Sequence, residues 1–336
     1  MKHPSLWTKS DLHHHLKHAL DLELWTIPLY LTALYSIKDL KKLKPHDYPD
    51  AAKLIYSVVI QEMLHLELVC NISNALGYSP KFSLPVYDEH KGIPFIHPTK
   101  DCLPEFLHGY CVKPQALNED CLRLFCAIEL PHPKKEMVWE HEHQYNSICE
   151  LYDALKIGIE ILWDECYVGD ARNTKQKNTF REYHNKEGRN HGFSQVVNSR
   201  DSALKAIEAI IEQGEGADAK KVPADFRAPH AEEGKEYDAA WYKGHLSHYQ
   251  KFRILLHHHH KLPLVYPETS AENNLPAQLE LEKAFTDFLK EMENNFNSEG
   301  AAMANSFWTK MFALGKAIAA VWEEGACPHF NVTLNA

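Results

Sequence analysis

The sequence has no long hydrophobic run, no closely paired cysteines and no excess of positive charge, and each absence excludes a class of protein. No uninterrupted apolar run reaches the roughly 18 to 20 residues that a membrane-spanning helix needs, and residues 1–15, MKHPSLWTKSDLHHH, lack the apolar core of a secretory signal. The 8 cysteines form no CxxC pair, which favours free thiols in a reducing compartment. The net charge of −10 argues against nucleic-acid binding through the overall field. We therefore expect a cytoplasmic protein that binds neither a membrane nor nucleic acid.

What the sequence does contain is an ordinary globular composition with many histidines. Apolar residues make up 44% and charged residues 24% of the 336 positions, a balance that excludes disorder and leaves room for one large domain or two smaller ones. Several of the 23 histidines are bunched, at 13–15 and at 257–260. We interpret both bunches as solvated patches, with 257–260 also suited to the negative end of a helix.

The periodicity of apolar residues predicts an all-α protein. Stripes at steps of three, four and seven mark helix faces, and Pro28 is expected to kink the first helix. The expected helices cover about residues 10–37, 48–76, 117–127, 140–163, 202–213, 239–258, 276–294 and 301–324. Repeated prolines predict a loop-rich insertion at about 80–140, where short apolar runs at 82–87 and 122–130 are strands or turns. We expect a bundle domain at 1–265 and a C-terminal helical pair at 266–336 packed on it.

Polar residues interrupt the apolar stripes of the first two long helices. Glu23 lies on the same face as its apolar neighbours, and Glu62 and His65 do so in the second helix. Side chains at i and i+3 are neighbours on a helix, so a Glu-x-x-His pair can reach one ion. A buried carboxylate is costly unless it is paired or bound to a metal.

The later helices carry further candidates. Glu150 shares an apolar face in the helix at 140–163, and His245 and His248 share one in the helix at 239–258. Four helices in order, each with a candidate on its stripe, match a carboxylate-bridged two-metal site in a four-helix bundle. The alternatives are an exposed acid at Glu62 and an ordinary core histidine at His65. Mixed oxygen and nitrogen donors suit iron or manganese.

Long motifs resemble the ferritin-like family of iminophenyl-pyruvate dimer synthases, which includes a domain of the violacein biosynthesis enzyme. The matching stretches are 23–37 (ELWTIPLYLTALYSI), 61–71 (QEMLHLELVCN), 147–153 (SICELYD), 211–216 (IEQGEG), 246–252 (LSHYQKF) and 325–330 (GACPHF). They follow the family's order over nearly the whole chain. The resemblance implies a ferritin-like four-helix bundle with a loop-rich insertion and additional C-terminal helices.

The resemblance also implies a ligand set, with one departure. The ligands that carry over are Glu23, Glu62, His65, Glu150 and His248, with Glu62 and His65 the candidate catalytic residues. The family pattern reads Glu-x-x-His in the last metal helix, whereas this chain has His245 in place of the glutamate. His245 is then a third nitrogen ligand, or it fails to bind, or Glu212 supplies the missing carboxylate. By pattern alone, Glu212 belongs to a solvated acidic face.

The implied function is that of a non-haem enzyme, most simply with two iron ions and with manganese as the other choice. It would use dioxygen to oxidise or oxidatively couple a small, possibly amino-acid-derived metabolite of secondary metabolism. The alternatives are metal storage without turnover and a degenerate family member whose site is broken at His245. The amphipathic C-terminal helices bury their apolar faces within the chain or in a homo-oligomer.

Overall fold

The computed structural model is mostly helical in the residues that it describes. These residues are 6–88, 92–96, 105–107, 109–131, 145–169, 174–179, 196–214, 246–269 and 275–330. Within them the α-helices are α1 (Lys9–Tyr35), α2 (Asp50–Ala75), α3 (Glu119–Ile128), α4 (Ile148–Cys166), α6 (Arg200–Gly214), α7 (His248–His257), α8 (Pro276–Asn297) and α9 (Asn305–Glu323). The only β-type pairing in this described part is two isolated bridges. The all-α prediction is confirmed.

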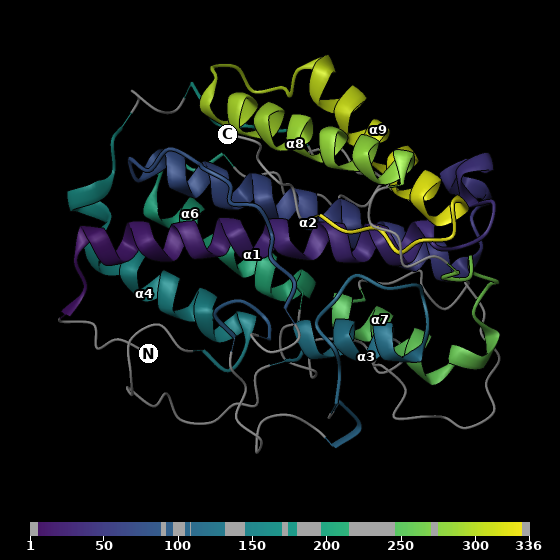
Figure 1. The fold of residues 1–336 in the computed structure, drawn as a ribbon. Helices are drawn as coiled ribbons and strands as arrows, with labels where there is room; N and C mark the ends of the chain where they lie inside the picture. Colours follow the sequence, from purple (N-terminus) through teal and green to yellow (C-terminus); the bar gives the residue numbers. More distant parts are fainter. Residues whose placement is uncertain are drawn as a thin grey trace.

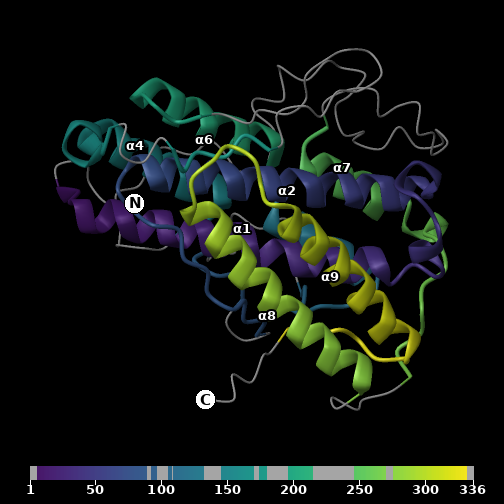
Figure 2. The same ribbon diagram turned by 90° about the horizontal axis from the view of Figure 1, so that it is seen from above.

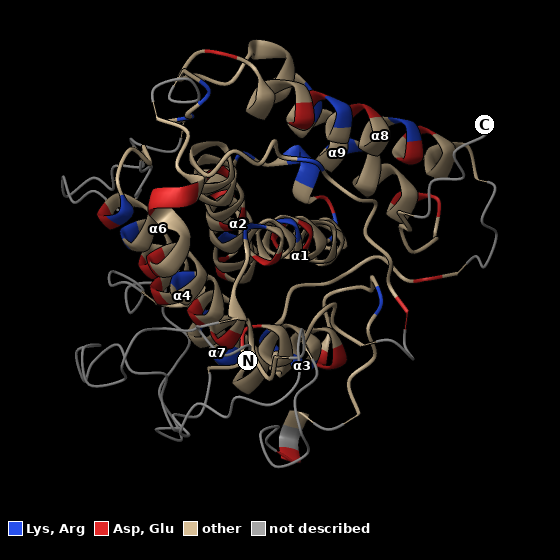
Figure 3. Cartoon of the chain, turned by 90° about the vertical axis from the view of Figure 1, so that its left-hand side faces the viewer, with Lys and Arg blue, Asp and Glu red and all other residues tan. Residues whose placement is uncertain are grey.

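The two long helices, α1 and α2, form the centre of the molecule. Two shorter pairs, α4 with α6 and α3 with α7, lie along them one after the other, and α8 with α9 cover another side (Figures 1 and 2). The view down the long axis in Figure 3 shows α1 and α2 enclosed between these three pairs. In a four-helix bundle, α3 followed by α4 fills the third position, and α6 followed by α7 fills the fourth.

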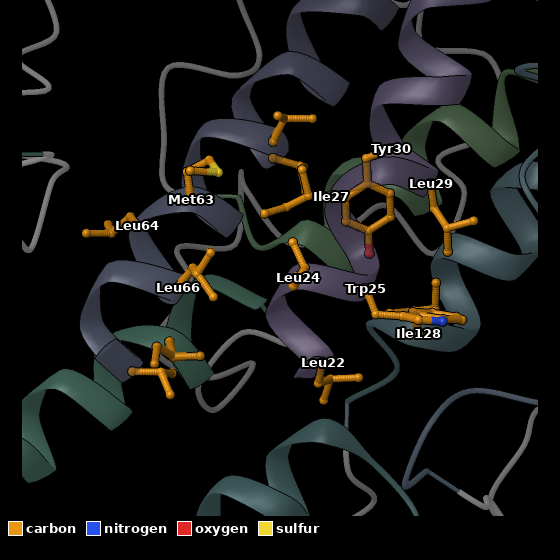
Figure 4. Close-up of a cluster of buried hydrophobic side chains, with 14 of the residues drawn as sticks. Leu22, Leu24, Trp25, Ile27, Leu29, Tyr30, Met63, Leu64, Leu66 and Ile128 are labelled. Atoms are coloured by element: carbon orange, nitrogen blue, oxygen red, sulfur yellow. The ribbon is translucent and has the colours of Figure 1, made fainter. Parts of the chain in front are cut away.

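Helix α1 is buried almost all round. It begins with a capping box in which Thr8 and Asp11 each accept a hydrogen bond from the other's backbone N–H, with Thr8 as the N-cap. The helix continues through Pro28, whose carbonyl accepts a hydrogen bond from the Thr32 hydroxyl at 2.7 Å. Figure 4 shows how α1 side chains such as Leu24 and Ile27 meet Met63 and Leu66 of α2.

Helix α2 is long and apolar enough to span a membrane by length and composition. However, 78% of its most apolar stretch is buried inside the fold. Its companions are α1, α6 and α7, so its hydrophobic surface is already covered by protein. We assign α2 to the bundle core.

The insertion and the later helices differ in detail from the sequence predictions. The short helix expected at about 117–127 is confirmed as α3, which is capped by Asn118, so the run at 122–130 is mostly helical; residues 82–87 form no strand. The helix expected from residue 140 begins at Ile148 within the described residues, and residues 140–144 lie outside them. The helix expected from residue 239 begins at His248 within the described residues, because Ser247 is extended and caps it.

The C-terminal pair is joined to the bundle through α1. The indole N–H of Trp322 in α9 donates to the carbonyl oxygen of Thr32 at 3.0 Å. Lys41 and Glu323 form an ion pair nearby. A Cβ atom at Gly315 would lie 2.6 Å from the Tyr35 ring, so only glycine permits this close approach.

Candidate metal centre

The candidate centre lies where the two short helix pairs meet against α1 and α2. Glu23 is near the middle of α1, and Glu62 and His65 are near the middle of α2. Glu129 directly follows α3, and His248 is the first residue of α7. All five side chains are at most 4% exposed.

Three of these side chains offer donor atoms that lie close together. Ligand atoms of Glu62, His65 and His248 all lie within 4.8 Å of one another. His248 Nδ1 is 2.8 Å from Glu62 Oε1 and 3.4 Å from Glu129 Oε1. His65 Nδ1 is 3.4 Å from Glu23 Oε2 and 3.9 Å from Glu62 Oε1. The donors of α2 and α7 therefore form one buried cluster, with Glu23 of α1 next to His65 and Glu129 of the α3 end next to His248.

A buried hydroxyl holds each of the three carboxylates. The donor and acceptor pairs are Thr26 with Glu62 at 2.5 Å, Tyr30 with Glu129 at 2.5 Å, and Tyr152 with Glu23. Burial raises the pKa of both tyrosines well above the usual value, so both stay protonated and donate. In Glu23 and Glu62, the oxygen that does not accept this bond faces a histidine.

Gln213 of α6 sets the orientation of the His65 ring. Its Oε1 atom lies 3.1 Å from His65 Nε2. An amide oxygen only accepts, so the imidazole proton sits on Nε2 and the Nδ1 lone pair faces Glu23 and Glu62. Such a partner on the far nitrogen is the usual arrangement for a metal-binding histidine.

The ionisable groups of the centre are shifted strongly by burial. Burial raises the pKa of Glu23 to about 8, although the Tyr152 hydrogen bond opposes the change. Burial also raises the pKa of Glu62 to about 7, with the charge of Glu129 adding to it. Burial lowers the pKa of His65 to about 4, so this ring is neutral. A dication at this point would favour the charged form of both carboxylates and the neutral histidine that coordination requires.

The two ring nitrogens of His248 have different surroundings, since Nδ1 faces the Glu62 and Glu129 carboxylates. Burial lowers its pKa, but the charges and hydrogen bonds of Glu129 and Glu62 outweigh burial and leave the pKa raised. Among the residues that the structure describes, no group is placed to hydrogen-bond its buried Nε2 atom. A buried polar atom without a partner is costly, and a bound cation would remove that cost at this cluster. The donor set of carboxylates and imidazoles therefore fits iron or manganese.

A small cavity adjoins the cluster. Its volume is about 20 Å³, the space of about one water molecule. Apart from the centre's own side chains, most of its lining is apolar. This lining includes Leu22, Ile148, Cys149, Ile210, Ile211 and Gly214. The cavity therefore has room for a water or a diatomic molecule beside the cluster.

A buried lysine lies beside the centre. Lys251, one turn along α7 from His248, is 7% exposed and donates to Oε1 of Gln61 in α2. Burial lowers its pKa to about 7, against the pull of Glu129 and Glu62. Its amino group therefore lies close to Glu129 and Glu62 and gives up its proton more easily than an exposed lysine does.

The structure brings together four of the seven residues that the sequence nominated, namely Glu23, Glu62, His65 and His248. Glu150 caps α4 instead: its Oε2 atom accepts from the backbone N–H of Asn146 at 2.7 Å and from the Asn146 amide at 3.1 Å. Glu212 is exposed on α6, and its neighbour Gln213 reaches the centre. His245 lies outside the described residues.

Sequence reasoning missed Glu129 altogether. The signal was present, because Glu129 is the one acidic residue in the apolar run at 122–130. The expected helix at about 117–127 ended before Glu129, and the run at 122–130 was also interpreted as a strand or turn, so this carboxylate was not placed beside the bundle core. The three hydroxyls and Gln213 were missed because no helix period distinguishes them from packing residues.

Comparisons with known proteins agree with this architecture. A ferritin-like family model matches residues 16–257, which span α1 to α7 and every residue of the centre. No curated protein matches the chain. The crystal structure of a ferritin-like protein from Caulobacter vibrioides is similar, with 30% sequence identity and a TM-score of 0.72 over 97% of this chain and 99% of that one. The chain belongs to the ferritin-like family.

Proposed function

We propose that this protein is a cytoplasmic non-haem metal enzyme that uses dioxygen to oxidise, or oxidatively couple, a small amino-acid-derived metabolite. The observation that carries the proposal is the convergence of Glu62, His65 and His248 within 4.8 Å in a buried site. Mixed carboxylate and imidazole donors favour iron, with manganese as the second choice. When bound, iron would supply the electrons for the reduction of dioxygen.

The chain's own residues prepare the site for that chemistry. Glu62 lies close to both histidines, with Glu23 near His65 and Glu129 near His248, so these five residues would hold the metal. The hydroxyls of Thr26 and Tyr152 fix one oxygen of their carboxylates, so the other oxygen is presented to the metal without rotation. Ligands held in this way cost little reorganisation when the charge of the centre changes.

The cavity supports a small gaseous co-substrate. A space of about 20 Å³ holds one water or one diatomic molecule, and its lining is largely apolar. Dioxygen is small and apolar, so it partitions into such a space more readily than a charged molecule does. An organic substrate would contact the centre only after side chains of the lining, such as Ile211 or Cys149, move aside.

The choice of an amino-acid-derived substrate rests on the resemblance to iminophenyl-pyruvate dimer synthases. The residues of that resemblance include Glu23, Glu62, His65 and His248, all of which lie at the centre. The ferritin-like fold by itself is compatible with many reactions.

The deciding experiment is the metal content of tag-free protein, measured by mass spectrometry after anaerobic loading with Fe(II), followed by exposure to oxygen. We expect about two iron ions per chain and stoichiometric oxygen consumption. Glu62→Ala and His65→Ala should each lose most of this metal. Replacement of His257 to His260 together is the control and should remove only loosely held ions. Many ions per chain would indicate storage, and unchanged metal in the Glu62 and His65 variants would refute the site.

A further inference from the structure

A second cluster of metal-binding side chains lies near the N-terminal end of α1, away from the carboxylate centre. His14 and His18 are one turn apart on the helix, and their Nε2 atoms are only 2.7 Å apart. The ring centroids are 4.0 Å apart, with the rings nearly perpendicular. Two imidazole nitrogens at this distance share one proton or one cation, because two N–H groups would repel each other.

The two rings are held differently, as a site with an open side requires. His18 is 9% exposed, and its ring packs on Phe95 at a centroid distance of 3.7 Å. His14 is exposed to solvent. One ligand is therefore fixed by packing while the other is accessible, which gives a metal ion a path to the pair.

The neighbouring His15 is engaged elsewhere. Its Nδ1 atom contacts the carbonyl oxygen of Asp11 at 2.7 Å, and its Nε2 atom contacts the hydroxyl of Tyr145. Both ring nitrogens thus have other partners, and the ring packs against Trp7. His15 anchors the helix end, and the convergent nitrogen pair is formed by His14 and His18.

We propose that His14 and His18 form a second metal site, for a divalent ion that prefers nitrogen ligands: Zn(II), Ni(II) or Cu(II). Histidines at i and i+4 are the spacing by which a helix presents two ligands to one zinc ion. The two donor atoms of the pair are imidazole nitrogens. Such donors suit Zn(II), Ni(II) and Cu(II), whereas Mg(II) and Ca(II) prefer oxygen ligands. We expect the pair to bind Cu(II) more tightly than Zn(II), as other imidazole sites do.

The site is separate from the buried centre. His18 and Glu23 are five residues apart, which is about 7.5 Å along the helix axis and well round its circumference. The two sites also differ in chemistry, since the buried centre is rich in carboxylates. Filling one should therefore leave the ligands of the other intact.

The test is a titration of tag-free protein, with its buried centre already loaded with Fe(II), by Zn(II) against a chromophoric chelator under anaerobic conditions. We expect the wild-type protein to bind one more Zn(II) ion than His14→Ala, while His46→Ala, which removes an exposed histidine elsewhere, behaves as the wild type. Zn(II) should also raise the melting temperature of the wild type and of His46→Ala, but not of His14→Ala, because an ion that binds only the folded pair stabilises it.

Two further measurements test whether the ion binds at His14 and His18 and not at the buried centre. Cu(II) bound at the pair should show coupling to two nitrogens by electron paramagnetic resonance, and to fewer in His14→Ala. The iron content of His14→Ala should equal that of the wild type, which separates failure of this site from failure of the buried centre. Equal Zn(II) stoichiometry and an equal melting-temperature rise in the wild type and His14→Ala would overturn the proposal.

Discussion

His248 Nδ1 lies 2.8 Å from Glu62 Oε1, which joins the first residue of α7 to the middle of α2. The contact connects a helix end to the middle of a continuous helix. The position of Glu62 is therefore fixed by α2 itself, whereas His248 reaches Glu62 only when α7 is packed against α2. Metal binding should consequently stabilise the docking of α7.

We expect opposite effects on iron content when Glu129 and Glu150 are replaced. Glu129→Gln keeps the size and the hydrogen bond from Tyr30 but removes a buried charge from the centre, so we expect a marked loss of bound iron. Glu150→Gln weakens only a helix cap, at a cost of about 1 kcal/mol or less, and should keep its metal. Metal analysis of the two variants side by side decides between the positions. Loss in Glu150→Gln with retention in Glu129→Gln would restore the assignment made from the sequence.

The Tyr152 hydroxyl should tune the affinity of the centre without contacting the metal. Tyr152→Phe removes the donor that orients Glu23, and loss of such a partner typically weakens metal binding about 10- to 100-fold. Tyr167→Phe, which changes a stacked tyrosine at the end of α4, is the matched control. Competition with a chelator gives both affinities. Equal affinities would show that Glu23 is held by packing alone.

Lys251 should oppose the binding of cations. Lys251→Met removes a buried positive charge near Glu62 and Glu129 and keeps the apolar stem, so we expect divalent-metal affinity to rise about tenfold or more. Lys53→Met, at an exposed position of the same bundle, should have little effect because solvent screens its charge. A fall in affinity for Lys251→Met would mean that the ammonium group supports the site through its bond to Gln61.

Glu23 should make the metal-free protein less stable as the pH rises. Its pKa is about 8 in the folded chain against 4.5 in the unfolded chain, so the folded state binds more protons between these values. This stabilisation is full below pH 4.5 and is lost as the pH rises to about 8, with a slope of at most about 1.4 kcal/mol per pH unit. The glutamine in Glu23→Gln does not titrate, so this variant lacks the pH-dependent contribution of Glu23 to the free energy of unfolding.

The measurement is the free energy of unfolding of both metal-free proteins from pH 5 to pH 8. The free energy of unfolding of Glu23→Gln, minus that of the wild type, should increase with pH. Taking the difference cancels the contributions of other groups, such as the opposite trend expected from Lys251. A difference that stays constant across this range would contradict the raised pKa.

The sequence predicts those parts of the site in which the relative positions of the residues depend on a single helix. Glu62 and His65 are three residues apart on α2, and helical geometry alone puts them side by side. Glu23 stood out as a carboxylate on an apolar stripe. The long helices α1 and α2 were predicted to within about two residues for the same reason, since their periodicity is strong.

The parts that could not be predicted depend on where helices end. Ser147 caps α4, and Glu150 in the first turn accepts from the backbone N–H of Asn146, a local role that competes with metal binding. On α6, Gln213 rather than Glu212 faces the bundle, a matter of about 100° of helix rotation that the motif does not specify. Glu129 reaches the centre because α3 ends just before it and packs beside the centre. The packing of α3 depends on the rest of the fold and cannot be deduced from the local sequence.

The breaks between α3 and α4 and between α6 and α7 have a consequence for how this architecture diversifies. Both breaks fall beside the metal ligands, while α1 and α2 run past them uninterrupted. Chain length can change at these two points without disturbing the packing of the long helices. A change in either connecting segment would therefore alter the surroundings of Glu129 or His248 while Glu62 and His65 keep their places on α2.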